Sequence, residues 1–446
     1  MDNVSGFGMK IIVVLLDGLG DRSYRHLGYR TPLQAAETPH LDRLAALGSN
    51  GLYHAARVGQ CLPSETAHYL MFGYDLENFP GRGLLEAVGY GLSFDDHDVL
   101  SLAHLVGIEW EDKGPVLVQA RKDIRGSRRD IARLYAALTP YDTENIRFEL
   151  HHTHTNDAVL ILKGRVSPFI SDSDPMVVGR PIARVRPLAG NPEPDEAART
   201  AGALNRYLTY CHRVLAGHEV NGLRRAENLP PANFLPTLRA GRRILQEPFQ
   251  RRWGLSAMMI ASGAVFEGLA HELGMAFVRV EDGEDPGEDL RGRVRMALTD
   301  HAHQFIHVHT KAADEAAHTG NPHRKQLAIS ALDRGLDELL AAVTEREDLL
   351  VAITADHSTP SVSDLIHSGE PVPISLVGST VRRDRVEAFD EVSCSGGSLG
   401  LLRGKEFMLT ILNHADRASL LGHRLGETAT PYVPDAYEAF QLSDEG

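Results

Sequence analysis

Seven side chains that could bind metal ions stand at or near the ends of apolar runs, divided between the two ends of the chain. Carboxylate and imidazole groups in such positions are typical of a site for two divalent cations. The residues are Asp17, Ser64, Asp314, His318, Asp356, His357 and His367. The serine among them could act as a nucleophile. Together the residues favour metal-assisted phosphoryl chemistry.

Two of the carboxylates directly follow apolar runs that predict buried strands, Asp17 after 11–16 and Asp356 after 349–353. In open α/β sheets, ligands gather at the carboxyl ends of the strands. Adjacent side chains at a strand end are expected to diverge, so Asp356 and His357 would serve two neighbouring metals. The structural alternatives are a turn-forming aspartate at Asp17 and a helix cap beside a core histidine at Asp356 and His357.

The remaining candidates depend on helices and a loop. Asp314 and His318 are four positions apart, which places both on one face of a helix, where they can hold one cation with a third ligand. A surface pair at the same spacing is the alternative, and His367 alone could be a solvated loop residue. Ser64 is expected at a helix N-terminus, where backbone N–H groups favour phosphate.

Other histidines are assigned structural roles. The run 151–154 is expected in a solvated strand or loop, and His307 and His309 alternate with apolar residues as they would on one face of a sheet.

Length and composition limit the class of protein. A chain of 446 residues, 43% apolar and 24% charged, is globular and predicts two lobes. The formal net charge of −14 disfavours binding to nucleic acid or to an anionic membrane. Three cysteines without a CxxC pair indicate a reducing cytoplasm, the first nine residues lack the basic start of a signal peptide, and no stretch approaches the roughly 20 apolar residues of a membrane span.

The pattern of elements predicts an α/β fold whose mostly parallel sheet has flanking helices, with an α+β lobe inserted into it. The expected parts are a metal-binding core over 1–80 and 250–446 and a substrate lobe over 81–249. For the core, the sequence predicts strands over 11–16, 257–260, 305–308, 349–353 and 372–377, helices capped by Thr31 and Thr38 with proline next, and a helix over 324–343. For the lobe, it predicts a hairpin turn over 109–114, a strand over 115–119, a helix over 129–138, paired strands over 145–150 and 158–163, a loop over 187–196 and a helix over 195–215.

The whole set resembles the archaeal-type cofactor-independent phosphoglycerate mutases of the alkaline phosphatase superfamily. The resemblance covers nearly the entire chain, and its motifs occur in the family's order. These motifs are 16–22, 31–39, 64–75, 81–83, Glu86-Ala87, 172–175, 314–320, 354–360 and 367–373.

The resemblance implies a phosphatase-like α/β core with an inserted transferase lobe, and it implies a role for each candidate. One metal would be held by Asp17, Ser64, Asp356 and His357, and the other by Asp314, His318 and His367. Ser64 would be the phosphorylated nucleophile. The substrate would be held by Asp123, Arg125, Arg128 and Arg239. Oxygen and nitrogen ligands without sulfur fit Mn²⁺ first, and Zn²⁺ or Co²⁺ as well.

The chain departs from the family near the nucleophile and in the inserted lobe. The nucleophile is flanked by Pro63 and Glu65, where the family has glycine and aspartate. The segment 102–108 replaces an Arg-x-Asn-Phe-Ala-Thr motif, and Ile124 replaces an arginine. Because arginine grips phosphate and carboxylate in a bidentate manner, these changes weaken the case for phosphoglycerate and leave the metal chemistry intact.

Three functions follow as hypotheses. The first is interconversion of 3- and 2-phosphoglycerate through a phosphoserine. The second is a metal-dependent phosphatase, or a phosphotransferase or mutase acting on another phosphate or phosphonate metabolite. The third, a non-catalytic binding protein on the same fold, conflicts with the complete ligand set. The expected partner is a small phosphorylated metabolite in the cytoplasm, without nucleic acid or membrane; the sequence makes no prediction of oligomeric state.

Overall fold

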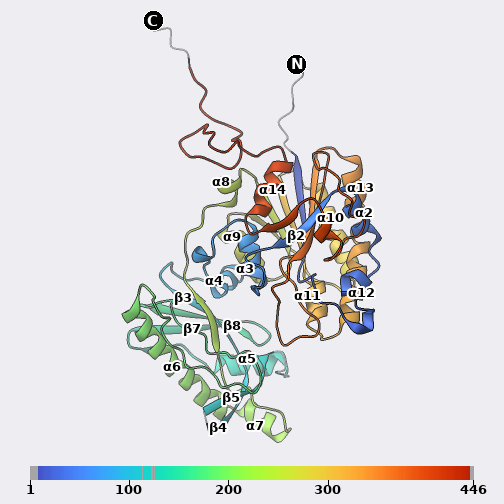
Figure 1. Cartoon of the computed structure of the whole chain (residues 1–446). Helices are drawn as coiled ribbons and strands as arrows, with labels where there is room; N and C mark the ends of the chain where they lie inside the picture. Colours follow the sequence, from blue (N-terminus) through green and yellow to red (C-terminus); the bar gives the residue numbers. More distant parts are fainter. Residues whose placement is uncertain (1–8, 113, 122–123, 125, 442–446) are drawn as a thin grey trace. The chain divides into compact units, whose positions relative to one another are not determined.

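The computed structural model describes residues 9–441 except 113, 122, 123 and 125, and the chain divides into two compact units. Unit 1 is formed by Met1–Phe79 with Gln246–Gly446, and unit 2 by Pro80–Leu245. Each has its own sheet (Figure 1). In the described part of the chain, no helix is both long enough and apolar enough to cross a membrane.

Unit 1 is built on a sheet in which all the described strands except β14 run in one direction. In spatial order its strands are β11 (Ala276–Arg279), β10 (Ala257–Ala261), β12 (Phe305–Thr310), β1 (Lys10–Leu16), β13 (Leu349–Thr354), β14 (Val372–Val377), β2 (Ser49–His54) and β15 (Gly400–Arg403). The predicted α/β fold with a mostly parallel sheet is confirmed.

Helices cover both faces of this sheet, with α3, α9 and α14 on one side and α2, α10, α12 and α13 on the other (Figure 1). The helices of unit 1 are α1 (Pro32–Ala35), α2 (Pro39–Leu47), α3 (Ser64–Met71), α8 (Phe249–Trp253), α9 (Ala264–Glu272), α10 (Pro286–Thr299), α11 (Ala312–Ala317), α12 (Pro322–Arg334), α13 (Asp337–Glu345) and α14 (Glu406–His414). Short 3-10 turns are η1 (Arg25–Leu27), η2 (Leu76–Asn78) and η4 (Cys394–Gly396).

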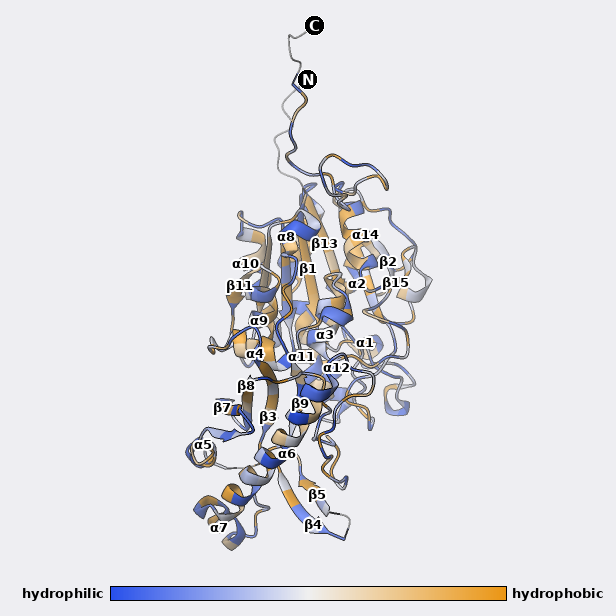
Figure 2. Ribbon diagram, turned by 90° about the vertical axis from the view of Figure 1, so that its left-hand side faces the viewer, coloured by the Kyte–Doolittle hydropathy of each residue, from blue (hydrophilic) through white to orange (hydrophobic). Residues whose placement is uncertain are grey.

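Strand β1 lies at the centre of the sheet, and this position accounts for its continuously apolar sequence. Residues 11–16 are fully buried because β12 and β13 pair with β1 on either side and helices cover both faces. Figure 2 shows β1 and β13 among the most hydrophobic segments of the chain. Since β1, β12 and β13 are parallel neighbours, their carboxyl ends meet at one edge of the sheet, and the segments that follow them converge there.

Unit 2 combines an antiparallel sheet with helices. Its described strands are β6 (Tyr141–Thr143), β7 (Ile146–His154), β8 (Asp157–Gly164), β3 (Val99–His104) and β9 (Thr237–Gly241) in spatial order, with β4 (Gly107–Glu111) and β5 (Gly114–Gln119) forming a separate hairpin. Its helices are α4 (Arg82–Gly89), α5 (Arg128–Ala136), α6 (Pro194–Gly217) and α7 (Glu219–Ala226). This is an α+β architecture.

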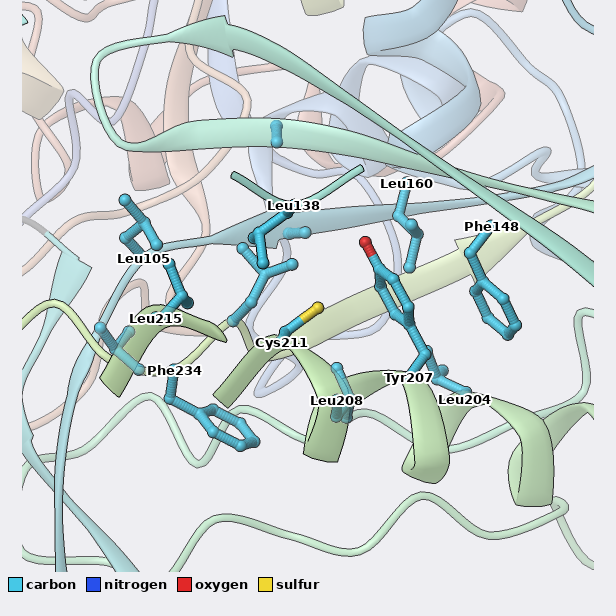
Figure 3. Close-up of a cluster of buried hydrophobic side chains, with 14 of the residues drawn as sticks. Leu105, Leu138, Phe148, Leu160, Leu204, Tyr207, Leu208, Cys211, Leu215 and Phe234 are labelled. Atoms are coloured by element: carbon cyan, nitrogen blue, oxygen red, sulfur yellow. The ribbon is translucent and has the colours of Figure 1, made fainter. Parts of the chain in front are cut away.

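The core of unit 2 forms between the sheet and α6 (Figure 3). The rings of Phe148 and Tyr207 stack with centroids 4.7 Å apart and planes inclined by 9°. Leu204, Leu208 and Leu215 continue the apolar face of α6 along the same cluster. Their spacing of four and seven residues is that of one helical face, so unit 2 buries its own apolar surface.

Most of the predicted elements are confirmed, including the hairpin before β5, the pair β7–β8 and the long helix α6. The predicted helix over 324–343 is wrong, because the chain forms α12 and α13 with a break at Gly335. A side chain there would meet the Gly287 carbonyl oxygen of α10 at 2.4 Å, so the close approach of α10 requires glycine. Thr31 caps α1, but Thr38 makes no cap to α2; its hydroxyl lies 3.5 Å from the Asp42 carboxylate.

Replacing Phe148 with alanine should destabilise unit 2 by about 3–5 kcal/mol, because it removes a buried ring and its stacking contact with Tyr207. Hydrogen exchange read on peptides of β7, β8 and α6 measures this loss of protection. The matched control is Phe440→Ala, since Phe440 is 88% exposed and its removal should cost less than about 0.5 kcal/mol. An equal effect of the two substitutions would show that Phe148 is not part of a packed core.

Candidate active site

The first group of candidate ligands lies at the carboxyl edge of the unit 1 sheet. Asp17 directly follows β1, Asp356 and His357 follow β13, and Ser64 is the first residue of α3. The Ser64 hydroxyl lies 3.0 Å from His357 Nε2 and 3.5 Å from Asp17 Oδ1. His357 Nε2 is 3.4 Å from Asp17 Oδ1 and 3.2 Å from Asp356 Oδ2. Four groups from three distant parts of the sequence therefore face one point.

The second group is formed by α11 and a loop. Asp314 lies on α11 and His318 is the residue after it, and His318 Nε2 is 3.3 Å from Asp314 Oδ2. His367 Nε2 is 3.7 Å from Asp314 Oδ1, while its Nδ1 donates to the Leu62 carbonyl oxygen at 2.7 Å. That bond fixes the ring, and it leaves Nε2 directed toward the carboxylate.

Asp356 and His357 do not diverge, contrary to the prediction. The chain bends after β13, and the Asp356 Oδ1 atom accepts hydrogen bonds from the backbone N–H groups of His357, at 3.0 Å, and Gly18, at 3.1 Å. This turn directs both side chains to the same group. The expectation assumed extended backbone, in which neighbouring side chains alternate, and the strand ends at Thr354.

Burial and neighbouring charges shift the pKa values of the three carboxylates. Burial, reinforced by the charge of Asp314, raises the pKa of Asp17 to about 6. Burial and the charge of Asp17 raise the pKa of Asp356 well above its usual value. At Asp314 burial acts in the same direction, but it is outweighed by the hydrogen bond from His318 and by nearby imidazoles, which lower the pKa. Like charges in one buried cluster resist ionising together unless a cation balances them.

The donor set fits two divalent cations. One ligand atom from each of Asp17, Asp356 and His357 can be chosen so that all three lie within 4.8 Å of one another, and the same holds for Asp314, His318 and His367. Within the described residues, the Asp356 Oδ2 atom is buried and accepts no hydrogen bond. A buried carboxylate oxygen without a donor is suited to a positive partner, and mixed oxygen and nitrogen ligands suit Mn²⁺, Zn²⁺ or Co²⁺.

Ser64 stands at the start of α3, as the sequence predicted. The preceding residue, Pro63, occupies the N-cap position and makes no side-chain cap. A helix N-terminus without a capping side chain favours a phosphate oxygen. The hydroxyl of Ser64 is therefore placed between two candidate metal ligands at a position suited to an anion.

Two buried histidines that support this site were not assigned to it from the sequence. His309 Nε2 donates to the second oxygen of Asp17 at 3.0 Å, and His68 Nδ1 donates to the Ser64 carbonyl oxygen at 2.7 Å. Burial lowers the pKa of both, that of His68 to about 3, so both rings are neutral donors. The sequence did place His309 on one face of a sheet. Only the structure shows that its strand, β12, lies beside β1 in the register that pairs His309 with Leu15 and so brings its ring to Asp17.

The proposed substrate residues belong to unit 2. Asp123 and Arg125 lie outside the described residues. Arg128 is the exposed first residue of α5, and it lines a cavity of about 570 Å³. The same cavity is lined by Arg121, His152, His154 and Asn156, among others. Arg239 lies on β9 with φ of 56°, a left-handed conformation that a side chain of this size rarely adopts, and its N–H donates to Asp172 Oδ1 at 2.7 Å.

Comparison with known proteins identifies the family of the chain. The sequence pattern of the Metalloenzyme superfamily matches residues 9–414. The 2,3-bisphosphoglycerate-independent phosphoglycerate mutase 2 of Methanocaldococcus jannaschii is 42% identical over 434 residues, covering 96% of this chain and 98% of that protein. The corresponding mutase of Methanopyrus kandleri is 35% identical over 426 residues, with 94% and 99% covered.

Solved structures give the same result. A Pyrococcus horikoshii protein superposes with a TM-score of 0.74 at 26% identity and covers 94% of this chain and 100% of its own. The cofactor-independent phosphoglycerate mutase of Thermoplasma acidophilum superposes with a TM-score of 0.59 at 29% identity, with 91% and 100% covered. The resemblance seen in the sequence is confirmed. The chain belongs to the Metalloenzyme superfamily and, within it, to the 2,3-bisphosphoglycerate-independent phosphoglycerate mutases.

Proposed function

We propose that this protein interconverts 3- and 2-phosphoglycerate through a phosphoserine formed at Ser64. The observation that carries the proposal is the position of the Ser64 hydroxyl, 3.0 Å from His357 Nε2 and 3.5 Å from Asp17 Oδ1, at the N-terminus of α3. A nucleophile between two ligand groups is the arrangement that phosphoryl transfer requires. Relatives that cover nearly the whole chain carry the same activity in their names.

The ligands of one cation are Asp17, Ser64, Asp356 and His357, and those of the other are Asp314, His318 and His367. When bound, the two cations would lower the pKa of the serine hydroxyl and offset charge on the phosphate oxygens. Mn²⁺ is the ion that we propose first, with Zn²⁺ and Co²⁺ as alternatives that the same donors accept. We place the activity in the cytoplasm, where a phosphorylated metabolite is available as substrate.

The chemistry at Ser64 proceeds in two steps. The serine hydroxyl loses its proton and its oxygen attacks the phosphorus in line, and the bond from phosphorus to the C3 oxygen of the substrate breaks as that oxygen gains a proton. The N–H groups of the first turn of α3 stabilise the phosphate oxygens. In the second step the C2 hydroxyl of the retained glycerate loses its proton and its oxygen attacks the phosphorus, the bond from phosphorus to the Ser64 oxygen breaks, and that oxygen takes up one proton.

Retention of glycerate distinguishes a mutase from a phosphatase. We propose that Asp123, Arg125, Arg128 and Arg239 bind this acid. Support comes from the cavity beside Arg128 and from the left-handed backbone at Arg239, since such conformations are commonly kept for function. The alternative is a metal-dependent phosphatase, or a phosphotransferase acting on another phosphate or phosphonate. It is favoured by the segment 102–108, which stands in place of the family's Arg-x-Asn-Phe-Ala-Thr motif, and by Ile124, which stands where the family has an arginine.

With Mn²⁺ and 3-phosphoglycerate, the purified protein should form 2-phosphoglycerate without releasing phosphate. Arg128→Ala should raise KM by roughly tenfold or more, because an arginine–carboxylate pair contributes about 1.5–3 kcal/mol. Both products are followed together by phosphorus NMR. The matched control is Arg133→Ala on the same helix, where the guanidinium already pairs with Glu219. Phosphate release without isomerisation would establish the phosphatase instead.

Ser64→Ala should lower kcat by at least about a thousandfold, because the phosphoserine intermediate cannot form. Brief incubation with labelled substrate, acid quenching and mass spectrometry of the peptide that contains residue 64 measures the phosphoenzyme. Metal binding should remain, because most of the ligands are untouched. Ser379→Ala, an exposed serine on the same unit, serves as the control. Turnover by Ser64→Ala at the wild-type rate would contradict the nucleophile assignment.

Asp356→Asn should have opposite effects with and without metal. In the chelated protein it should raise stability by about 1 kcal/mol, since it removes one of several buried like charges. It should also abolish most of the stabilisation by Mn²⁺, which for the wild type is about 2.7 kcal/mol at a hundred times Kd. Thermal unfolding in EDTA and in Mn²⁺ measures both effects. Equal stabilisation of wild type and variant by Mn²⁺ would exclude Asp356 as a ligand.

A further inference from the structure

One threonine hydroxyl contacts both candidate metal groups. Thr359 is fully buried, two residues beyond His357. Its Oγ1 atom lies 2.7 Å from Asp314 Oδ1, in the second group, and 3.2 Å from His357 Nδ1, in the first. None of the roles described above for catalysis or ligand binding involves Thr359.

The hydrogen-bonding capacity of the three partners fixes the direction of each bond. An ionised carboxylate only accepts, so the Thr359 hydroxyl donates its proton to Asp314. The hydroxyl oxygen is then an acceptor, and it can receive only the N–H of the His357 imidazole. His357 therefore carries its proton on Nδ1, and the lone pair of Nε2 is directed toward Ser64, Asp17 and Asp356. A histidine with its lone pair so directed is in the tautomer that a metal requires.

The backbone of Thr359 is held rigidly. Its N–H donates to the Gly20 carbonyl oxygen at 2.9 Å, and its own carbonyl oxygen accepts from Lys325 Nζ at 2.8 Å. The same ammonium donates to the Gly20 carbonyl oxygen at 2.8 Å and lies 3.3 Å from Asp21 Oδ2. Lys325 and Asp21 are both buried. These bonds tie the loop after β13 to the loop after β1, so the backbone that carries the hydroxyl is fixed.

The Thr359 hydroxyl and the Asp314 carboxylate can approach each other because Gly18 has no side chain. A Cβ atom at Gly18 would lie 2.6 Å from Thr359 Oγ1 and 2.6 Å from Asp314 Oδ1. The glycine also has φ of +63°, in the left-handed region. The close approach of Thr359 to Asp314 is therefore built into the turn that follows β1.

We propose that Thr359 is a positioning residue that couples the two metal sites, by orienting Asp314 in one and selecting the ligating tautomer of His357 in the other. This inference rests on the proposed function in one respect, namely that the two groups bind metal. It predicts that loss of a single hydroxyl weakens binding at both sites, although Thr359 is not among the ligands proposed for either ion.

Mn²⁺ titration of the full-length protein by calorimetry tests this coupling. Thr359→Val keeps the shape of the side chain and removes the hydroxyl, and it should weaken both binding events by about 10–100-fold, as loss of an outer partner of a ligand does. Thr359→Ser keeps the hydroxyl and should bind nearly as the wild type does. Thr354→Val is the control for a buried threonine, since the Thr354 hydroxyl donates to the Pro373 carbonyl oxygen at 3.0 Å and contacts no ligand. Its Mn²⁺ affinity should be unchanged.

A second readout follows the ligand geometry itself. The visible absorption of bound Co²⁺ should change in Thr359→Val and return in Thr359→Ser. If Thr359→Val does not fold, Thr359→Ala, which removes the hydroxyl without overpacking, takes its place. Wild-type Mn²⁺ affinity in the variant without the hydroxyl, or equal weakening in Thr359→Ser, would overturn the inference and leave the proposed function standing. Absence of Mn²⁺ binding in the wild type would overturn both.

Discussion

Repulsion among buried carboxylates is the constraint on which this site depends. Asp17 and Asp356 are buried together at the carboxyl ends of the central strands, and Asp314 lies close enough to raise the pKa of both. Apolar surroundings penalise each charge, and the negative neighbours add to the penalty. A cluster of this kind is costly in a protein that has no cation to place in it. The same cost makes the cluster a strong site for divalent cations, because binding removes the repulsion.

The parallel sheet of unit 1 brings the carboxylates of that cluster together. Three parallel strands end at one edge, so the chain segments that follow them must converge on a small space. Glycines in the first of these segments let the loops approach, and neutral histidines behind them hold the carboxylate and the nucleophile segment in place. Lys325 joins the loop after β1 to the loop after β13 by donating to the carbonyl oxygens of Gly20 and Thr359. The order in the site therefore comes from buried, directional hydrogen bonds at the end of a rigid sheet, which is how a metal site is kept in its geometry.

Unit 2 is stabilised by a core of its own. That core is formed by α6 against an antiparallel sheet, with the rings of Phe148 and Tyr207 stacked within it. Leu102 and Ile124, at the positions where the sequence departs from the expected family motifs, are both buried, so these two side chains contribute to packing. A protein can retain its metal chemistry in one unit while the other unit is altered toward a different substrate. The product assay with 3-phosphoglycerate decides whether that has happened here.

The sequence by itself determined the α/β class, the central strands, most of the helices and the identity of the residues that gather at the site. It could do so because a strand buried on both faces reads as a continuous apolar run, and because ligands in open α/β sheets bind at the carboxyl ends of the strands. It did not reveal the break at Gly335, the joint orientation of Asp356 and His357, or the parts played by His309, His68 and Thr359. Most of these depend on a partner far away in the sequence: the α10 backbone for Gly335, the Gly18 amide for Asp356, Asp17 for His309 and Asp314 for Thr359. The bond from His68 to the Ser64 carbonyl oxygen is local, but it needs the helix and the ring orientation that only the structure shows. Local pattern fixes which residues are buried, but only the tertiary structure decides which buried polar groups meet, because hydrogen bonds need distances and directions that spacing along the chain does not contain.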